Sequence, residues 1–272
     1  MRHADHHPAF AGSIPQFYER YMVPLIFAPY AADLAARTAQ HRPIKVLEIA
    51  AGTGVVTRQL AQVLAPDAAI TATDLNRTML DHAASIGTGR AVHWQAADGQ
   101  RLPFEDGAFD AVVCQFGVMF FPEKARAFAE ARRVLRPGGA LHFNVWDHIE
   151  HNAFAQSVTD ALALEFPQDP PRFMAHTPHG YHDVAVIARD LANGGWTTRA
   201  QIETLAHRSR ADTAREVAIA YCQGTPIRNE IEARAPQDLQ AITERTAQAL
   251  AQQYGSGVVD GKIQAHVVTI TR

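Results

Sequence analysis

A glycine turn and three acidic residues stand at the ends of predicted strands, where together they could hold a nucleoside. The turn at 50–54 follows an apolar strand that carries Glu48 near its end, and a charge in that place needs a partner or solvent. Asp74 follows a second strand, twenty residues beyond the turn, so its carboxylate can accept hydrogen bonds from ribose hydroxyls. Asp98 follows a third strand, within reach of the amino group of an adenine ring. Glycines in the turn let the backbone approach such a ligand closely.

The spacing of the turn distinguishes between nucleotide cofactors. A dinucleotide site requires Gly-x-Gly-x-x-Gly to seat a pyrophosphate on a helix N-terminus, and the third glycine position is Thr57 here. The phosphate-binding signature Gly-x-x-x-x-Gly-Lys-Ser/Thr does not occur in the sequence. An adenosyl cofactor without a pyrophosphate fits better, and a dinucleotide-dependent oxidoreductase stays open as an alternative.

The elements that must position these residues alternate between strand and helix from residue 45 onward. Strands are predicted at 45–49, 69–73, 91–96, 109–116, 140–146, 198–207 and 262–271. Near-continuous apolar strands that alternate with helices indicate a parallel sheet covered on both faces. Such sheets bind ligands at the carboxyl ends of their strands, which is where the turn and the acidic residues lie.

Helices are predicted on both sides of this alternation. Three prolines should break the helical segment 13–40 into short pieces, because proline disrupts a helix interior. A helix over 122–135 should be closed by Gly138 and Gly139. Later helices are predicted at 152–166, 183–192, 212–222 and 238–254.

We expect one structural domain made of three parts. Residues 1–40 should form an arm and helices that act as a lid, 41–147 the cofactor-binding core, and 148–272 the remaining core strands with a helical insertion on the substrate side. The later part is rich in large apolar side chains, which favours a lid over a partly apolar small molecule, although core packing explains much of the same pattern.

The composition restricts the class of protein. The chain has 272 residues, 47% hydrophobic and 19% charged, with a formal net charge of −3, so it can bury a large core and is not typical of a disordered chain. The mildly acidic balance argues against a general nucleic-acid binder. No run approaches the ~18 apolar residues of a membrane span, and the polar N-terminus is not typical of a secretory signal. Two cysteines cannot make a disulfide framework, so we expect a reducing cytoplasm.

Fourteen histidines prompt a search for metal ligands. His176, His179 and His182 recur at regular three-residue steps, but Pro178 and Gly180 interrupt any shared helix face. The histidines nearest the N-terminus fall on the predicted arm. We therefore expect no metal site.

Five stretches of the chain resemble, in order and spacing, the class I S-adenosylmethionine-dependent methyltransferases. The resemblance is closest to the small-molecule branch related to the ubiquinone and menaquinone biosynthesis methyltransferases. The matching stretches are Val46–Gly54, Thr73–Asn76, Ala97–Gly99, Leu102–Asp110 and Arg133–Gly139. The resemblance implies an α/β, Rossmann-like three-layer sandwich with a mostly parallel seven-stranded sheet whose last strand is antiparallel.

The resemblance also implies S-adenosyl-L-methionine as cofactor and S-adenosyl-L-homocysteine as product. Asp74 would hold the ribose hydroxyls, Asp98 would bind the adenine amino group, and Gln115 would face the methionine amino end. Gly52 and Gly54 would form the floor under the methionine part. The full set that the resemblance assigns to the cofactor is Tyr21, Glu48, Ala50, Gly52, Gly54, Asp74, Leu75, Met79, Ala97, Asp98, Gly99, Gln115 and Phe116.

Some of these residues have a structural alternative, and one departs from the family pattern. Asp74 could cap a helix, Asp98 could be a solvated loop acid, and Gln115 could be a polar residue satisfied at a strand end. Ala50 stands where many members of the family have a glycine, so the turn can sit slightly differently. Glu48 would orient the turn or water near the cofactor's amino group.

Methyl transfer by direct displacement is the reaction that the resemblance implies. The protein must then hold the acceptor in line with the methyl group and exclude water. A general base is needed only for a hydroxyl or a carbon acid, and His148 and His151, which follow the fifth strand, are the candidates beside a surface or capping role. Tyr18 and Tyr21 could close over the cofactor, and core packing explains them equally well.

The acceptor is expected to be a small, partly apolar molecule and not a nucleic acid. The sequence leaves open whether oxygen, nitrogen or carbon is methylated, and the chain could form a homodimer. A second alternative is a protein that binds S-adenosylmethionine without transferring its methyl group.

Overall fold

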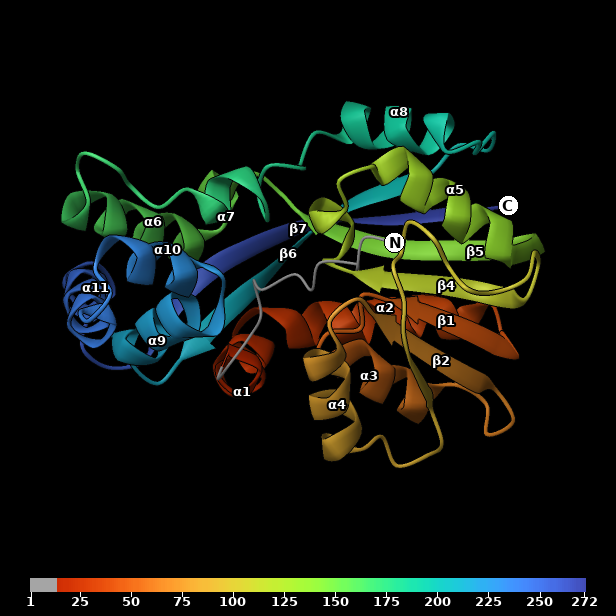
Figure 1. Cartoon of the computed structure of the whole chain (residues 1–272), viewed down its shortest axis with the longest axis horizontal. Helices are drawn as coiled ribbons and strands as arrows, with labels where there is room; N and C mark the ends of the chain where they lie inside the picture. The colour runs from red at the N-terminus through yellow and green to blue at the C-terminus, as the bar shows by residue number, and fades with distance from the viewer. Residues whose placement is uncertain (1–13) are drawn as a thin grey trace, which may run out of the picture.

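A seven-stranded sheet forms the centre of the computed structural model, which describes residues 14–272 (Figure 1). Its strands are β1 (Lys45–Ile49), β2 (Ala69–Asp74), β3 (His93–Ala96), β4 (Phe109–Gln115), β5 (Leu135–Trp146), β6 (Gln201–Ala211) and β7 (Val259–Thr271). Their order in space is β3-β2-β1-β4-β5-β7-β6, with β7 antiparallel to both of its neighbours. The other strands point the same way, so the expected mostly parallel sheet with an antiparallel last strand is confirmed. The predicted arm of the first twelve residues lies outside the described part of the chain.

Helices cover both faces of this sheet, which makes the three layers that the resemblance implied. Figure 1 shows α5 and α8 on one face, α2 and α3 on the other, and α6, α9, α10 and α11 together at one end of the molecule. The α-helices are α1 (Ile14–Phe17), α2 (Ala28–Gln40), α3 (Val55–Val63), α4 (Arg77–Ile86), α5 (Lys124–Val134), α6 (Ala153–Glu165), α7 (Phe173–His176), α8 (Val184–Asn193), α9 (Ala214–Gly224), α10 (Ile227–Arg234) and α11 (Leu239–Tyr254). A π-helix, η2 (Tyr18–Phe27), and two 3₁₀ turns, η3 (Val118–Phe120) and η4 (Ile149–His151), complete the set.

The first helical segment is continuous, although its prolines predicted that the helix would be broken into short pieces. Pro24 lies inside the π-helix η2, in which the Ala28 N–H donates to the carbonyl of Val23, five residues back. Proline has no N–H to give to an α-helical ladder, and its ring collides with the carbonyl four residues earlier. Single π turns occur at such interruptions and are frequent at functional sites. Pro29 opens α2 in the first turn, where no N–H donor is required.

The two glycines expected to close helix α5 lie inside β5 instead. Helix α5 ends at Val134, and Leu135 already pairs with Phe109 of β4 before the register shifts. Pro137 explains this early end, because proline disfavours helical backbone at the residue before it. Gly138 has φ +78° and donates its N–H to the carbonyl of Arg272, which ties β5 to the last strand.

Two short helices after residue 166 were not predicted, namely α7 and α10. Each is brief, and α10 begins directly after Pro226, so neither offers enough turns for a clear apolar period. The strand expected at 198–207 begins and ends later, as β6, and continues to Ala211. Its extra length is set by pairing with β7, which runs from Gln201↔Thr269 to Ala211↔Val259.

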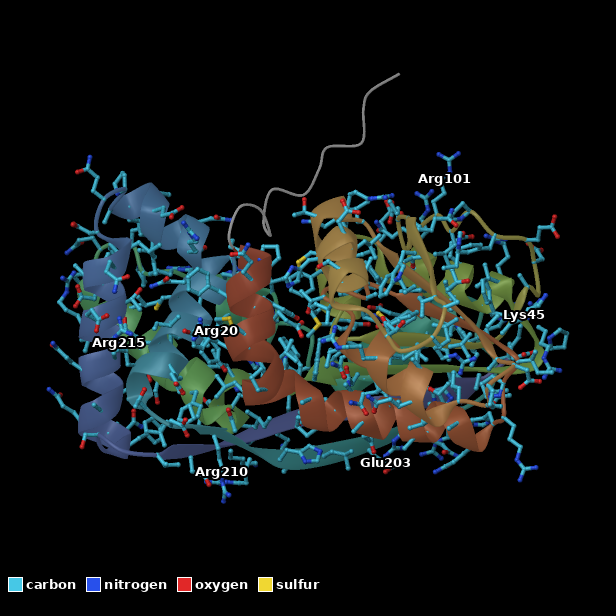
Figure 2. All side chains as sticks on the ribbon, turned by 90° about the horizontal axis from the view of Figure 1, so that it is seen from below. Arg20, Lys45, Arg101, Glu203, Arg210 and Arg215 are labelled. Atoms are coloured by element: carbon cyan, nitrogen blue, oxygen red, sulfur yellow. The ribbon has the colours of Figure 1, made fainter. Side chains whose placement is uncertain are left out.

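Charged side chains protect the edge of the sheet at β6. This strand has one neighbour only within the described sheet, so a row of backbone groups faces outward. Figure 2 shows Glu203 and Arg210 pointing away from the sheet along this edge. Arg208 and Arg210 both pair with Asp260 on β7, and Glu203 pairs with Arg37 on α2. Such charges oppose edge-to-edge pairing with another strand.

Within residues 14–272, no helix has the length and apolar character needed to cross a membrane.

Gly54 starts helix α3 where the chain passes close to two other elements. Its φ is +82°, and a Cβ placed there would lie 3.1 Å from the Ala83 Cβ and 3.2 Å from Cη2 of Trp94. Ala83 belongs to α4 and Trp94 belongs to β3, so this glycine allows the turn after β1 to pack against both elements. Gly89 has a similar φ of +73°, but a Cβ placed there would meet no atom of the described chain within 4 Å.

The pair Gly54 and Gly89 therefore separates packing from backbone strain. We expect Gly89→Ala to lower the free energy of unfolding by about 1–2 kcal/mol, the cost of a left-handed non-glycine residue. Gly54→Ala should cost this amount and roughly 1–3 kcal/mol more, because the added methyl group overpacks the turn. Urea denaturation of both variants measures the difference. Equal losses would show that Ala83 and Trp94 move aside freely.

Candidate active site

A cavity of about 440 Å³ opens at the carboxyl ends of β1, β2 and β4. This volume lies within the usual range of roughly 300–1,000 Å³ for small-molecule sites. Ten of the residues assigned by the resemblance line it, namely Ala50, Gly52, Asp74, Leu75, Met79, Ala97, Asp98, Gly99, Gln115 and Phe116. The sheet therefore brings residues from four separate stretches of the sequence into one hollow.

Asp74 connects two of these stretches. One oxygen of its carboxylate accepts the N–H of Gly52 at 2.8 Å, and the other accepts the N–H of Asn76 at 2.8 Å. Burial raises the pKa of this carboxyl above its ordinary value, and the backbone donors of Asn76 and Gly52 act in the opposite direction. Each carboxylate oxygen has two lone pairs, so both can accept a further hydrogen bond from a bound hydroxyl.

Strained backbone surrounds the same hollow. Ala50 has φ +56° and Phe116 has φ +49°, both unusual for residues with a side chain. Gly117 makes their approach feasible, because a Cβ there would lie 2.5 Å from that of Ala50. The Phe116 N–H donates to Oδ1 of Asn144 at 2.9 Å, which helps to hold this conformation. Strain of this kind gathers at ligand sites, where the surrounding structure fixes it.

Asp98 lines the cavity from a turn that its own carboxylate stabilises. The carboxylate accepts the Gln100 N–H at 2.8 Å. Gly99 is buried, and a Cβ there would lie 2.8 Å from the ring of Phe121, which also lines the cavity. The glycine therefore admits an aromatic ring that the sequence reasoning did not assign.

Gln115 offers an acceptor without a partner. Its side-chain Nε2 donates to the carbonyl of Phe27 at 3.4 Å, while the buried Oε1 has no hydrogen-bond partner among the described residues. A buried polar atom in this condition is costly unless a ligand or water satisfies it. The residues present thus fit a ligand that brings an N–H or ammonium donor to this point.

Comparison with known proteins agrees with this geometry. Residues 47–143 match the family described as "Methyltransferase domain". The ubiquinone/menaquinone biosynthesis C-methyltransferase of Burkholderia cenocepacia is 35% identical over 168 residues, and the match covers 58% of this chain and 69% of that protein. The chain belongs to the class I S-adenosylmethionine-dependent methyltransferases. The corresponding protein of Methylobacterium nodulans is 35% identical over 123 residues, so the match spans 43% of this chain and about half, 47%, of that relative.

A solved structure supports the methyltransferase fold over nearly the whole chain. An S-adenosylmethionine-dependent methyltransferase of Thermotoga maritima superposes with a TM-score of 0.54, covering 95% of this chain and 98% of its own. The two sequences are 14% identical, so this likeness concerns the fold.

Three residues assigned to the methyltransferase cofactor lie outside the cavity lining, namely Tyr21, Glu48 and Gly54. Tyr18, three residues earlier than Tyr21, lines the cavity, whereas the ring of Tyr21 stacks on Phe17. The backbone of Gly54 serves the packing of α3 described above. The sequence reasoning did not assign several other lining residues, namely Ile49, Asn76, Gln100, Gly117, Phe120, Phe121, Pro122, Phe173 and Thr177. The two adjacent phenylalanines before Pro122 were the one feature of the sequence that could have indicated this part of the cavity wall.

A smaller apolar chamber of about 50 Å³ adjoins the cavity. It shares Tyr18, Phe116, Phe120 and Phe173 with the larger one, so these rings form the boundary. The rest of its wall is Met22, Ile26, Phe27, Trp146, Met174, Pro178, Thr225 and Pro226. The rings of Phe116 and Trp146 stack at 3.8 Å with an angle of 6° between their planes.

The two histidines predicted as bases lie outside both cavities. His151 is exposed, and the ring of His148 lies 3.5 Å from the Glu150 carboxylate and 4.7 Å from the ring of His182. β5 ends at Trp146, which lines the chamber, and the chain then continues into η4. The base role of His148 and His151 stays a prediction. No group of three or more histidine, cysteine, aspartate or glutamate side chains within residues 14–272 could hold a metal ion.

Glu48 lies beneath the turn and is 1% exposed. Its carboxyl accepts the hydroxyl of Thr57 at 2.5 Å. Burial raises the pKa of Glu48 to about 8, and the negative charge of Asp74 adds to this, while Thr57 and Arg58 oppose it. At neutral pH the folded protein thus retains a proton that an exposed glutamate would lose.

This proton makes stability depend on pH in a defined direction. The unfolded chain releases it near pH 4.5, and the folded chain releases it near pH 8, so the stabilisation is fully present below about pH 4.5 and lost as the pH rises to about 8. Glu48→Gln should therefore gain stability relative to the wild type across this interval, by at most about 1.4 kcal/mol per pH unit. Thermal unfolding of ligand-free protein at several pH values measures the gain. Glu105→Gln, at an exposed position, is the control, and parallel curves for wild type and Glu48→Gln would contradict the buried-proton assignment.

Proposed function

We propose that this chain transfers a methyl group from S-adenosylmethionine to a small, partly apolar organic acceptor and releases S-adenosylhomocysteine. The observation that carries the proposal is the pair of adjoining cavities with a common wall of four aromatic rings. The larger one presents carboxylates and an amide oxygen, and the smaller one presents rings and thioethers. A polar methyl donor and an apolar acceptor would thus meet at this wall.

The polar groups of the larger cavity suit the parts of an adenosyl cofactor. Asp74 would accept hydrogen bonds from the ribose hydroxyls, and Asp98 would accept one from the adenine amino group. Oε1 of Gln115, which lacks a partner in the described chain, would accept one from the methionine amino end. Gly52 lets the turn pass beneath the ligand, since its φ of +57° suits glycine. The bound cofactor would supply a methyl group already activated by a positively charged sulfur.

The residues of the smaller chamber, which at about 50 Å³ is too small for a whole organic molecule, would surround the reacting end of the acceptor and exclude water. Phe27, Phe116 and Trp146 pack against one another, with ring centroids 5.6 Å and 6.0 Å apart in the pairs that Phe27 makes. Met22 and Met174 complete the apolar wall, and thioethers adapt to irregular ligand shapes. Holding a nucleophile in line with the methyl group in a dry site is the main catalytic work that this displacement requires.

The similar proteins indicate which class of acceptor to test first. Those of Methylobacterium nodulans and Burkholderia cenocepacia are described as C-methyltransferases, which favours a carbon acceptor. The formal net charge of −3 supports a small molecule over a nucleic acid. A homodimer and a cytoplasmic location stay predictions.

Calorimetric titration with S-adenosylmethionine, followed by an acceptor screen that measures S-adenosylhomocysteine, tests the proposal. We expect binding and product formation with at least one apolar acceptor. Binding without turnover for any acceptor would favour the alternative of a cofactor-binding protein. Binding of a nicotinamide dinucleotide in place of the adenosyl cofactor would overturn both.

The ribose assignment predicts a specific loss of affinity. Asp74→Asn should weaken binding of S-adenosylhomocysteine by about 1–3 kcal/mol, because the amide provides one acceptor oxygen where the carboxylate provides two charged ones. Asp67→Asn, which changes an exposed acid before β2, is the matched control and should leave affinity unchanged. Calorimetry on the three proteins gives the comparison. Equal affinity of Asp74→Asn and wild type would remove the ribose role.

A further inference from the structure

An ion pair joins the π-helix η2 to the helix that follows the glycine turn. Nη2 of Arg58 lies 2.6 Å from Oε1 of Glu19, and the two residues are 39 positions apart in the chain. Both side chains are largely buried, with 19% and 23% exposed. A charged hydrogen bond that is shielded from water holds its partners more firmly than a surface pair.

The same guanidinium also holds the turn. Its Nη1 donates to the carbonyl of Thr53 at 2.7 Å, and this nitrogen lies 3.5 Å from the Cβ position of Gly54. Arg58 thus uses separate N–H groups for the turn and for η2, and its planar fork keeps the two in a fixed relation. Its positive charge also acts on Glu48 beneath the turn.

A movement of η2 would change both cavities together. Tyr18 and Phe27 lie at the two ends of η2, their rings stack at 4.9 Å, and Tyr18 lines both hollows. A π-helix is a rare and strained form, so its position depends on the contacts around it. On its other side, η2 packs against α9, where a Cβ at Gly224 would lie 3.3 Å from the Tyr18 nitrogen.

One oxygen of the Glu19 carboxylate reduces the net stability of the ion pair. Only one carboxylate oxygen of Glu19 is bonded to Arg58, and the other, Oε2, is buried and has no hydrogen-bond partner within the described chain. The desolvation cost of that oxygen offsets part of the attraction. Opening would let water reach the oxygen, which lowers the cost of breaking the pair.

We propose that the Glu19–Arg58 pair is a latch that holds η2 against the glycine turn, and that its opening controls release of the adenosyl product. Arg58 is thus a positioning residue that acts through the turn and through Tyr18. The release step rests on the proposed function, whereas the latch itself is a property of the ligand-free chain.

Hydrogen exchange of the ligand-free protein tests the latch without any ligand. In Glu19→Gln, the amides of η2 should exchange roughly tenfold faster or more, while those of β1 and β4 stay as in the wild type. Arg37→Gln is the matched control, because Arg37 is similarly buried at 21% exposed and pairs with Asp33 and Glu203 away from the cavities. Unchanged exchange in η2, or faster exchange throughout the sheet, would overturn the latch.

The rate of S-adenosylhomocysteine release, measured by stopped-flow dilution, tests whether the latch controls product release. Glu19→Gln should release the product about tenfold faster than wild type, and Arg58→Lys, which keeps the charge but not the fork, should fall between them. Equal release rates would overturn the gating role. If the wild type fails to bind this product, the proposed function fails, and the exchange experiment still decides the latch.

Discussion

The hydrogen bond from the Gly52 N–H to the Asp74 carboxylate is the contact on which the rest of the site depends. β1 and β2 pair in parallel up to Ile49↔Thr73, so their carboxyl ends arrive side by side. The Ala51 N–H then donates to the carbonyl of Thr73, and the Asp74 carboxylate takes the next N–H along the turn. A carboxylate in this place requires donors, and the turn requires an acceptor for its N–H groups. The carboxylate and the turn therefore stabilise each other, and this interaction determines the geometry of the candidate site.

A second constraint is the close approach of the turn after β1 to the chain after β4. Ala50 and Phe116 both adopt left-handed backbone, and Gly117 leaves the space in which they meet. Asn144 on β5 contributes by accepting the Phe116 N–H with both its carbonyl and its side-chain oxygen. Three neighbouring strands thus hold one aromatic ring at the boundary between two cavities. The strain is retained because the parallel sheet fixes all three strands independently of the ligand.

The sequence predicted those parts of the site that depend on local pattern. Asp74 and the glycine turn follow strands, and strand ends in a parallel sheet converge, so their meeting in one cavity follows from topology. The sequence could not show whether Tyr18 or Tyr21 lines the cavity, because an α-helical period does not predict a π-helix. The additional residue in each π turn changes which side chain faces the cavity. His148 lies just beyond β5, and Asp74 is the last residue of β2, yet at the end of β5 it is Trp146 that lines the chamber. The pairing of β5 with β7 sets which residues of β5 point inward, and β7 lies more than a hundred residues away, beyond any local pattern.

Thr57 links the stability of the fold to the choice of cofactor. A dinucleotide site places a glycine at this position so that the helix can pack closely on the strand. Here the Thr57 hydroxyl donates to Glu48, and this bond ties α3 to β1 through a side chain instead of through a bare backbone contact. Glu48, the acid in an apolar strand, and Thr57, which departs from the dinucleotide pattern, are therefore partners in one hydrogen bond. A glycine at position 57 would remove the hydroxyl that Glu48 accepts, so the dinucleotide pattern would cost this buried acid a hydrogen bond.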